Sequence, residues 1–255
     1  TAGSIPMLLM TVLPLCVFAE NTVHLHVSKG GTDVSNSPTI NYVRNVFLPT
    51  LKRIGINANL TVHRYGYYPK GMGEVTIIVE PCKSLKPLVL EDFGKLKSVK
   101  GVSVCTFLAE RKVAERQAKA ANDYLKEKGY TAEIQIINDR SNPLQKGSSL
   151  VLYAETHTGV ILGADAIGEL RKTSETVGRE AAEKLYAEIS AEPTVDVHLA
   201  DMLVPYVALA EGRSAYLTRT VSEHLETNIW LAEKILGVKF NVKKVAGLYK
   251  IEKVD

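Results

Sequence analysis

The sequence has few cysteines, almost no excess of charge and no hydrophobic run of membrane-spanning length. Three cysteines among 255 residues, Cys16, Cys82 and Cys105, exclude a disulfide-rich scaffold. They lie far apart in apolar surroundings, so we expect reduced core thiols, a cytoplasmic location and no zinc site. The net charge of +3 means that any binding of nucleic acid must rest on local basic patches.

One apolar segment, residues 5–19, resembles the hydrophobic part of a secretory signal peptide. No basic residue precedes it, Pro14 interrupts it, and it is shorter than the roughly 20 residues that a membrane span needs. We therefore predict a buried core helix. The sequence also lacks an initiator Met, and residues 1–4 lead as a cap directly into this helix, so we expect that a longer protein has lost its beginning.

With 45% hydrophobic and 23% charged residues, the chain is globular, and its apolar pattern predicts the same order of elements at both ends. The first set is a helix at 4–20, a strand at 23–28, a helix at 39–54, and strands at 57–64 and 74–80. The second set is a helix at 199–210, a strand at 214–220, a helix at 223–236, and strands at 238–242 and 248–253.

The letters repeat together with the elements. Leu13–Glu20 aligns with Val204–Glu211, and Gly55 corresponds to Gly237, each as the glycine that ends a helix. We predict two copies of one unit, each with its helices on one face of a small sheet whose other face is wet.

Residues 89–191, between the two copies, carry more charge and have their own cycle of elements. We expect strands at 101–106, 131–137, 150–155 and 160–163, and helices at 109–128 and 174–189. Such a block returns the chain to the repeat that it interrupts. We therefore predict a main domain of residues 1–88 and 192–255 and an inserted domain of residues 89–191, whose ends lie close together.

Several strings within this framework resemble those of the RNA 3′-terminal phosphate cyclases, in the family's order and over the whole chain. They are Thr1-Ala-Gly-Ser4, Gly30-Gly-Thr-Asp33 with Pro38, Tyr65 to Glu74, Ala114-Glu-Arg-Gln117, Leu199-Ala-Asp201 and His224-Leu-Glu-Thr-Asn228. The resemblance implies an α+β fold of repeated two-helix, four-strand units, similar to the enolpyruvyl transferases, with an inserted small α/β domain. It also implies that a first unit, with a Gly-rich segment and nucleotide contacts, is absent here.

By this resemblance the protein is an enzyme that uses ATP to convert an RNA 3′-terminal phosphate into a 2′,3′-cyclic phosphodiester. A histidine attacks the α-phosphate of ATP and keeps AMP, AMP passes to the RNA phosphate, and the neighbouring 2′-hydroxyl expels it. The motif position of that histidine is His224. The implied ligands are ATP, a divalent cation such as Mg²⁺ and RNA with a 3′-terminal phosphate; no membrane is implied, and a homo-oligomer is possible.

The local sequence is compatible with a nucleophilic role for His224. Thr220 and Glu223 match a capping box, and Ser222 is a second candidate cap, so His224 falls in the first turn of a helix. There the helix dipole disfavours imidazolium and favours a bound phosphate. On spacing alone, a surface histidine at a helix start is the alternative. Two arginines could neutralise charge nearby, Arg213 and Arg219.

The resemblance further implies a nucleotide site in which Pro38 and His198 are opposite walls of a slot for the base. Asp201, expected at a helix start, is the candidate ligand of Mg²⁺ or of a ribose hydroxyl, although it is equally compatible with a plain helix-start aspartate. Met10 and Met202 stand where better-known members have glutamine, so we expect looser base selectivity. The implied cofactor-binding residues are His198, Leu199, Ala200, Asp201, Met202, Pro38 and Met10.

Three further features have two interpretations each. The loop at 65–73, with tyrosines, Lys70 and glycines, fits either stacking on RNA bases or a tight hairpin at a packing seam. His24 and His26 alternate on one strand, as a metal pair or as part of a wet sheet face. The basic residues Arg111, Lys112, Arg116 and Lys119 alternate with acids, which is typical of a solvated helix face.

Two other functions compete with the cyclase. A ribosome-biogenesis factor of the same fold would bind RNA without cyclising it, but relatives of that kind lack the histidine. A small-metabolite transferase of the enolpyruvyl transferase kind needs several Arg or Lys residues for its phosphorylated substrates and no nucleophilic histidine. The presence of His224 favours the cyclase.

Overall fold

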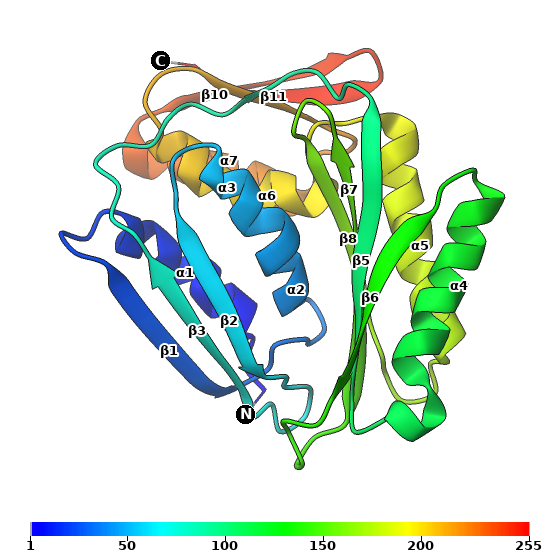
Figure 1. The fold of residues 1–255 in the computed structure, drawn as a ribbon. Coiled ribbons are helices and arrows are strands. Elements are labelled where there is room, and N and C mark those ends of the chain that lie inside the picture. Colours follow the sequence, from blue (N-terminus) through cyan, green and yellow to red (C-terminus); the bar gives the residue numbers. More distant parts are fainter. Residues whose placement is uncertain (1, 255) are drawn as a thin grey trace.

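The computed structural model describes residues 2–254, and Thr1 of the expected cap lies outside them. It contains three β-sheets with helices packed against them, which confirms the α+β fold class (Figure 1). The helices are α1 (Ile5–Val17), α2 (Ile40–Tyr42), the π-helical η1 (Val43–Phe47), α3 (Leu48–Lys52), the 3₁₀ turn η2 (Ala109–Arg111), α4 (Val113–Glu127), α5 (Ser174–Ala191), α6 (Val197–Leu209) and α7 (Glu223–Leu236). The strands are β1 (Val23–Gly30), β2 (Ala58–Arg64), β3 (Gly73–Val79), β4 (Val89–Leu90), β5 (Leu96–Thr106), β6 (Ala132–Asp139), β7 (Gly147–Thr156), β8 (Ile161–Ile167), β9 (Ser214–Thr218), β10 (Lys239–Val245) and β11 (Leu248–Val254).

The two predicted copies have the same connectivity. The first forms an antiparallel sheet in the order β1-β3-β2, and the second repeats this order as β9-β11-β10. Helix α1 corresponds to α6, and the continuous helical segment α2–η1–α3 corresponds to α7. The copies differ in strand number, because β4 adds a parallel fourth strand beside β9 while the first sheet has three strands within residues 2–254.

Two predicted helices are interrupted. Within the second, Leu48 donates its backbone N–H to the carbonyl of Val43 and forms a π-turn, next to Pro49, which has no N–H for a regular helical bond. The helix expected at 109–128 is divided into η2 and α4, because Lys112 between them has a left-handed backbone with φ 51°.

Helix α1, predicted as a buried core helix, packs one face into the core and leaves the other face exposed. Ile5, Leu9 and Leu13 are at most 2% exposed, whereas Leu15 is 77% exposed on the other face. Ser4 caps the helix by accepting a hydrogen bond from the Met7 N–H. Among the described residues, no helix combines the length and apolar character needed to cross a membrane.

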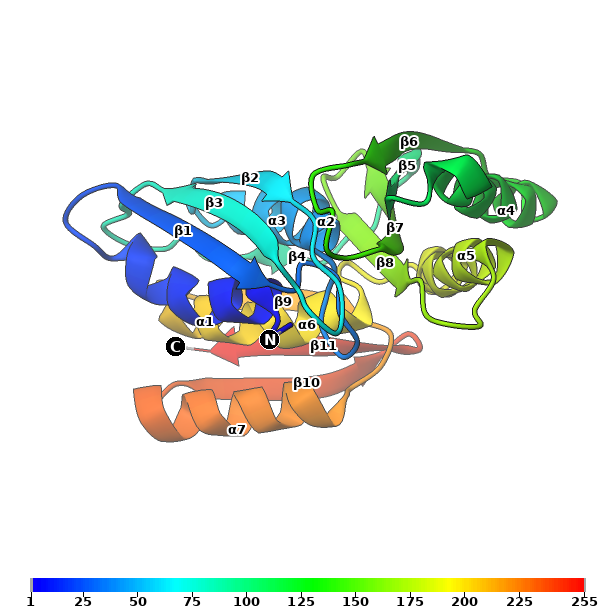
Figure 2. The same cartoon turned by 90° about the horizontal axis from the view of Figure 1, so that it is seen from below.

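The middle of the chain forms its own layer, to the right in Figure 1, with the mixed sheet β6-β5-β7-β8 covered on one face by α4 and α5 (Figure 2). The chain leaves and re-enters the other part at neighbouring points, because the Thr194 hydroxyl donates to the carbonyl of Leu90 at 2.7 Å. Strand β4, at the start of the expected inserted domain, pairs with β9 of the second copy. The division into a main and an inserted domain stays a prediction.

Candidate nucleotide and phosphate site

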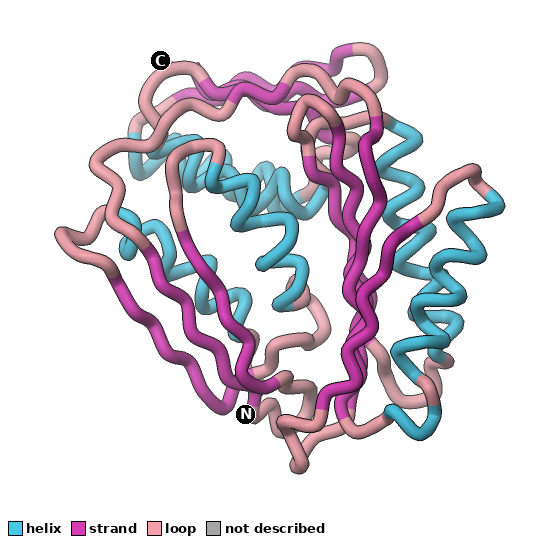
Figure 3. The backbone as a smooth tube through the Cα atoms, in the orientation of Figure 1, coloured by secondary structure: helices cyan, strands magenta, loops and turns pink. Residues whose placement is uncertain are grey.

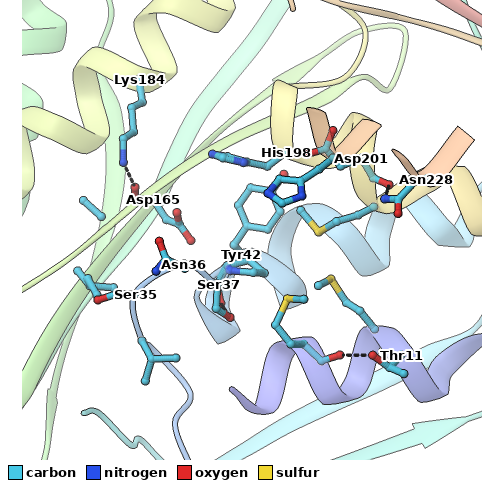
Figure 4. Close-up of a pocket in the computed structure, with 18 of the residues that line it drawn as sticks. Thr11, Ser35, Asn36, Ser37, Tyr42, Asp165, Lys184, His198, Asp201 and Asn228 are labelled. Carbon is cyan, nitrogen blue, oxygen red and sulfur yellow. Dashed lines mark hydrogen bonds between the residues drawn. The ribbon is translucent and has the colours of Figure 1, made fainter. Parts of the chain in front are cut away.

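A cavity of about 790 Å³ lies where α1, α6 and α7 face the turn at 34–38 and the β8–α5 layer. Figure 4 shows His198, Asp201 and Asn228 on one side of it and Asp165 and Lys184 on the opposite side. It brings together most of the residues that the sequence implicated. Those that line it are Met10, Pro38, His198, Asp201, Met202 and His224.

Two of the implicated residues do not line the cavity. Leu199 and Ala200 are fully buried in the core, so their side chains cannot contact a ligand there. The reason is helical periodicity: His198, Asp201 and Met202 share the cavity face of α6, and the residues between them face inward. That Leu199 and Ala200 take part in binding the nucleotide stays a prediction, and their side chains do not line this cavity.

Helix α6 begins two residues earlier than predicted, at Val197, because Asp196 caps it. The Asp196 carboxylate accepts hydrogen bonds from the backbone N–H of His198 at 3.1 Å and of Leu199 at 2.9 Å. Asp201 consequently lies in the second turn and not at the helix start, which corrects its predicted place.

Asp196 also joins three parts of the molecule. Fully buried, it accepts hydrogen bonds from the Tyr42 hydroxyl at 2.8 Å and from the Gly163 N–H at 2.8 Å. Tyr42 follows Pro38 on the helix of the first copy and lines the cavity, and Gly163 lies on β8. One carboxylate thus fixes the helix that carries His198 against the opposite wall.

His224 lies in the first turn of α7, as predicted, and its ring is exposed toward the cavity. The cap is Ser222, whose hydroxyl accepts from the Leu225 N–H at 3.0 Å, so the alternative Thr220–Glu223 capping box is not formed. Gly237 ends the helix with φ 71°, a left-handed conformation that glycine adopts without strain.

A short set of hydrogen bonds holds α6 and α7 together beside His224. The Ser222 hydroxyl donates to the Asp201 carboxylate at 2.6 Å, and the Asn228 side-chain amide donates to the Asp201 carbonyl at 3.0 Å. Partial burial raises the pKa of Asp201, and the Ser222 hydrogen bond, His198 and His224 oppose that shift. Asp201 therefore lies within electrostatic range of both histidines.

The opposite side of the cavity was missed from the sequence. Asp165 on β8 accepts a hydrogen bond from the Thr39 N–H at 2.7 Å, at the start of α2, and burial raises its pKa. Lys184 on α5 donates to the Asp165 carbonyl at 3.1 Å and to Glu180 at 2.8 Å, and Lys172 pairs with the same Glu180. A charged residue inside the apolar run 161–167 was the available sequence signal for Asp165.

The two arginines expected near His224 are engaged elsewhere. Arg219 forms an ion pair with Glu188 at 3.0 Å, and Arg213 pairs with Glu91 and Glu252. Neither of them lines the cavity. The cations at the cavity come instead from the β8–α5 side.

The loop at 65–73 is mostly a packing hairpin. Tyr65 and Tyr67 are buried, with hydroxyls bonded to Asn41 and Thr106, whereas Tyr68 is 77% exposed. The exposed side chains of this loop are those of Tyr68, Pro69 and Lys70.

The sheet-face histidines and the three cysteines, which the sequence also singled out, do not line the cavity. His26 and His63 both lie beside the Thr76 hydroxyl, and no group of three or more metal-ligating residues is found within residues 2–254. Cys16 and Cys105 are buried and Cys82 is half-buried, and all three are free.

The N-terminal turn of α7, two histidines and a carboxylate thus open into one cavity of an α+β repeat protein, an arrangement suited to a phosphorylated ligand. The sequence model of the RNA 3′-terminal phosphate cyclase family matches residues 1–242. Proteins named RNA 3′-terminal phosphate cyclase are similar: that of Pyrobaculum aerophilum is 42% identical over 252 residues, 99% of this chain and 72% of its own. The protein of Methanopyrus kandleri is 42% identical over 97% of this chain and 71% of its own length. The protein of Pyrococcus furiosus is 41% identical over 97% of this chain and 70% of its own length. The chain belongs to the RNA 3′-terminal phosphate cyclase family of enzymes.

Proposed function

We propose that this chain uses ATP to convert an RNA 3′-terminal phosphate into a 2′,3′-cyclic phosphodiester through an adenylate on His224. The observation that carries the proposal is that the exposed ring of His224 opens into the same cavity as Pro38, His198 and Asp201. The family and its similarly named relatives support the overall reaction.

In the first step a ring nitrogen of His224 attacks the α-phosphorus of ATP, and pyrophosphate leaves. Unpaired N–H groups and the positive dipole end in the first turn of α7 favour phosphate oxygens at this place. Hydrogen bonds through Ser222 and Asn228 fix Asp201 beside the reacting ring.

In the second step an oxygen of the RNA 3′-phosphate attacks the phosphorus of the AMP held on His224. The P–N bond breaks, the ring of His224 leaves, and AMP is joined to the RNA phosphate. The neighbouring 2′-hydroxyl then attacks the 3′-phosphorus, loses its proton, and AMP leaves. We propose Pro38 and His198 as walls for the base, with Met10 and Met202 as apolar neighbours that give no amide contacts.

Asp201 is the proposed contact for Mg²⁺ or for a ribose hydroxyl. One carboxylate suits an ion that is shared with the phosphates of ATP, because Mg²⁺ keeps several waters and needs few protein ligands. The ion would supply neutralisation of phosphate charge, and Asp201 already has one oxygen bonded to Ser222.

The test is incubation with ATP labelled at the α-phosphate. We expect a protein label that is lost in acid and stable in alkali, as a phosphoramidate is, and no label in His224→Ala. His157→Ala, which removes an exposed histidine from the turn between β7 and β8, is the matched control and should label fully. A label that persists in His224→Ala would refute the assignment, and RNA binding without any label would favour a non-catalytic RNA-binding factor.

A further inference from the structure

One edge of the molecule gathers every loop at one end of the β6-β5-β7-β8 sheet. Strand pairing brings Thr106 beside both Asp139 and Gly147, and Ser149 beside Ile167, so the connections at 107–112, 140–146 and 168–173 share this edge. Figure 3 shows these connections, one of which includes the short helical turn η2, along the bottom of the view, next to the hairpin at 65–72. We call this the loop edge.

The hairpin at 65–72 is held rigidly against these loops. Asn142, fully buried, donates to the carbonyls of Tyr65 at 2.8 Å and Gly71 at 3.1 Å. Gln145 donates to the carbonyl of Tyr68 at 2.8 Å and accepts from the N–H of Lys70 at 3.3 Å. The exposed Tyr68 and Lys70 side chains are therefore presented from a fixed backbone.

The loop edge carries cations that have no acidic partner. Six exposed Lys and Arg side chains on this edge form no hydrogen bond or ion pair within residues 2–254. By contrast, Arg116, Lys119 and Arg179 on the nearby helices are all ion-paired. Only two exposed acids, Glu110 and Glu169, lie on the same loops. The unpartnered cations are Lys70, Arg111, Lys112, Arg140, Lys146 and Arg171.

Exposed aromatic and aliphatic side chains are interspersed among these cations. They are Tyr68, Phe107, Leu144 and Leu170, and Leu170 is 98% exposed. Cations that neutralise phosphates, beside rings on which bases stack, are the features that bind single-stranded nucleic acid. An acidic protein would match the cations but would leave the rings without a stacking partner.

The loop edge is continuous with the cavity. Ile167, Glu169 and Lys172 line the cavity, and Leu170 and Arg171 lie between them in sequence. A strand whose 3′ end enters the cavity can therefore pass directly onto this edge.

We propose that the loop edge binds the single-stranded RNA segment that leads to the reacting 3′ end. The proposal rests on the proposed function, because it takes RNA as the substrate. It assigns to the β8–α5 layer and the hairpin a role in holding the RNA chain, apart from the nucleotide chemistry at His224.

The experiment measures binding of a fluorescein-labelled single-stranded RNA that ends in a 3′-hydroxyl and so cannot react. We compare the full chain, the triple variant Lys70→Ala/Arg140→Ala/Lys146→Ala, and the control triple Lys86→Ala/Lys239→Ala/Lys243→Ala, which removes the same charge from exposed positions elsewhere. At about 0.7 per phosphate contact in a single strand, the slope of log affinity against log salt should fall by about 2 in the first triple. The control triple should keep the slope of the unmodified chain.

Tyr68 provides a second readout that is independent of charge. Tyr68→Ala should weaken binding about tenfold without changing the salt slope, and Tyr68→Phe should restore it because the ring is kept. Adenylylation by ATP, which needs no RNA, is measured on the same preparations. Equal RNA affinities of the loop-edge and control variants would overturn the proposal that the loop edge binds RNA. If the affinities differed as expected but the protein was never adenylylated by ATP, the cyclase assignment would be overturned and the RNA-binding surface would stand.

Discussion

At the scale of single residues, the chain buries carboxyl groups around its cavity. Asp33, Asp165 and Asp196 are buried behind or within the cavity walls, and burial is the first cause of the raised pKa of each. Asp165 and Asp196 accept backbone N–H groups from neighbouring segments, so they hold the walls together. These two roles could not be predicted from the sequence. Asp165 bonds to Thr39, and Asp196 bonds to Tyr42 and Gly163, all in distant segments; only the bonds of Asp196 to the start of α6 are local.

Asp33 gives a stability prediction with a defined sign. Burial raises its pKa to about 7, from about 3.9 in an unfolded chain. Between these values the folded state keeps a proton that the unfolded state has released, so the Asp33 contribution to the free energy of unfolding falls as pH rises. The fall is about 1.4 kcal/mol per pH unit and levels off above about pH 7.

Asp33→Asn is neutral at every pH and should remove this dependence. Urea unfolding near pH 5 and near pH 8 should show the variant gaining stability relative to the unmodified chain at the higher pH. Asp123→Asn, at an exposed site on α4, controls for loss of a carboxylate and should show no such gain. Parallel pH profiles for Asp33→Asn and the unmodified chain would contradict the raised pKa.

At the scale of elements, the sequence predicted helix ends that are set by residues next to them in the chain. Helix α7 runs over the predicted residues 223–236 because its cap, Ser222, and its stop, Gly237, are adjacent in sequence. The start of α6 was missed although its cap, Asp196, is a local signal of the same kind; its further bond to Tyr42, 154 residues away, was not visible in the sequence. In the candidate site, the helical period of α6 accounts for the cavity-facing residues His198, Asp201 and Met202. The sequence could not place Asp165 and Lys184 there, because their positions depend on how β8 and α5 pack.

Ser222 couples the stability of α7 to the geometry of the site. Ser222→Ala loses the cap and the hydrogen bond to Asp201, so we expect about 1 kcal/mol less stability and slower adenylylation of His224. Thr173→Ala removes the cap of α5, which accepts from the Thr176 N–H at 3.1 Å, away from His224. It should lose similar stability and label at the normal rate. Equal labelling rates in the two variants would show that the Ser222–Asp201 bond has no part in the reaction.

At the scale of the whole molecule, one hydrophobic core runs through both repeat copies and the β8–α5 layer. The repeat was visible in the sequence because the two copies share letters and periodicity. The docking of the intervening segment was not visible in the sequence. It depends on contacts between distant residues, such as Arg53 with the Thr158–Gly159 turn and Arg219 with Glu188. The continuous core predicts a single cooperative unfolding transition.

The Arg219–Glu188 pair tests this docking. The Glu188 side chain is 6% exposed and burial raises its pKa, so Arg219→Ala leaves a buried carboxyl without its cation and should cost about 1–3 kcal/mol. Glu188→Gln should cost less, because a neutral amide oxygen still accepts from Arg219. Arg179→Ala breaks an exposed pair with Glu183 and should leave the midpoint of urea unfolding unchanged.

The fluorescence of Trp230, the single tryptophan, and far-UV circular dichroism should give coincident transitions in all three variants. If Glu188→Gln cost more stability than Arg219→Ala, the docking would not depend on this buried pair. If the two probes gave separate transitions in the unmodified chain, the two parts would not share one cooperative core.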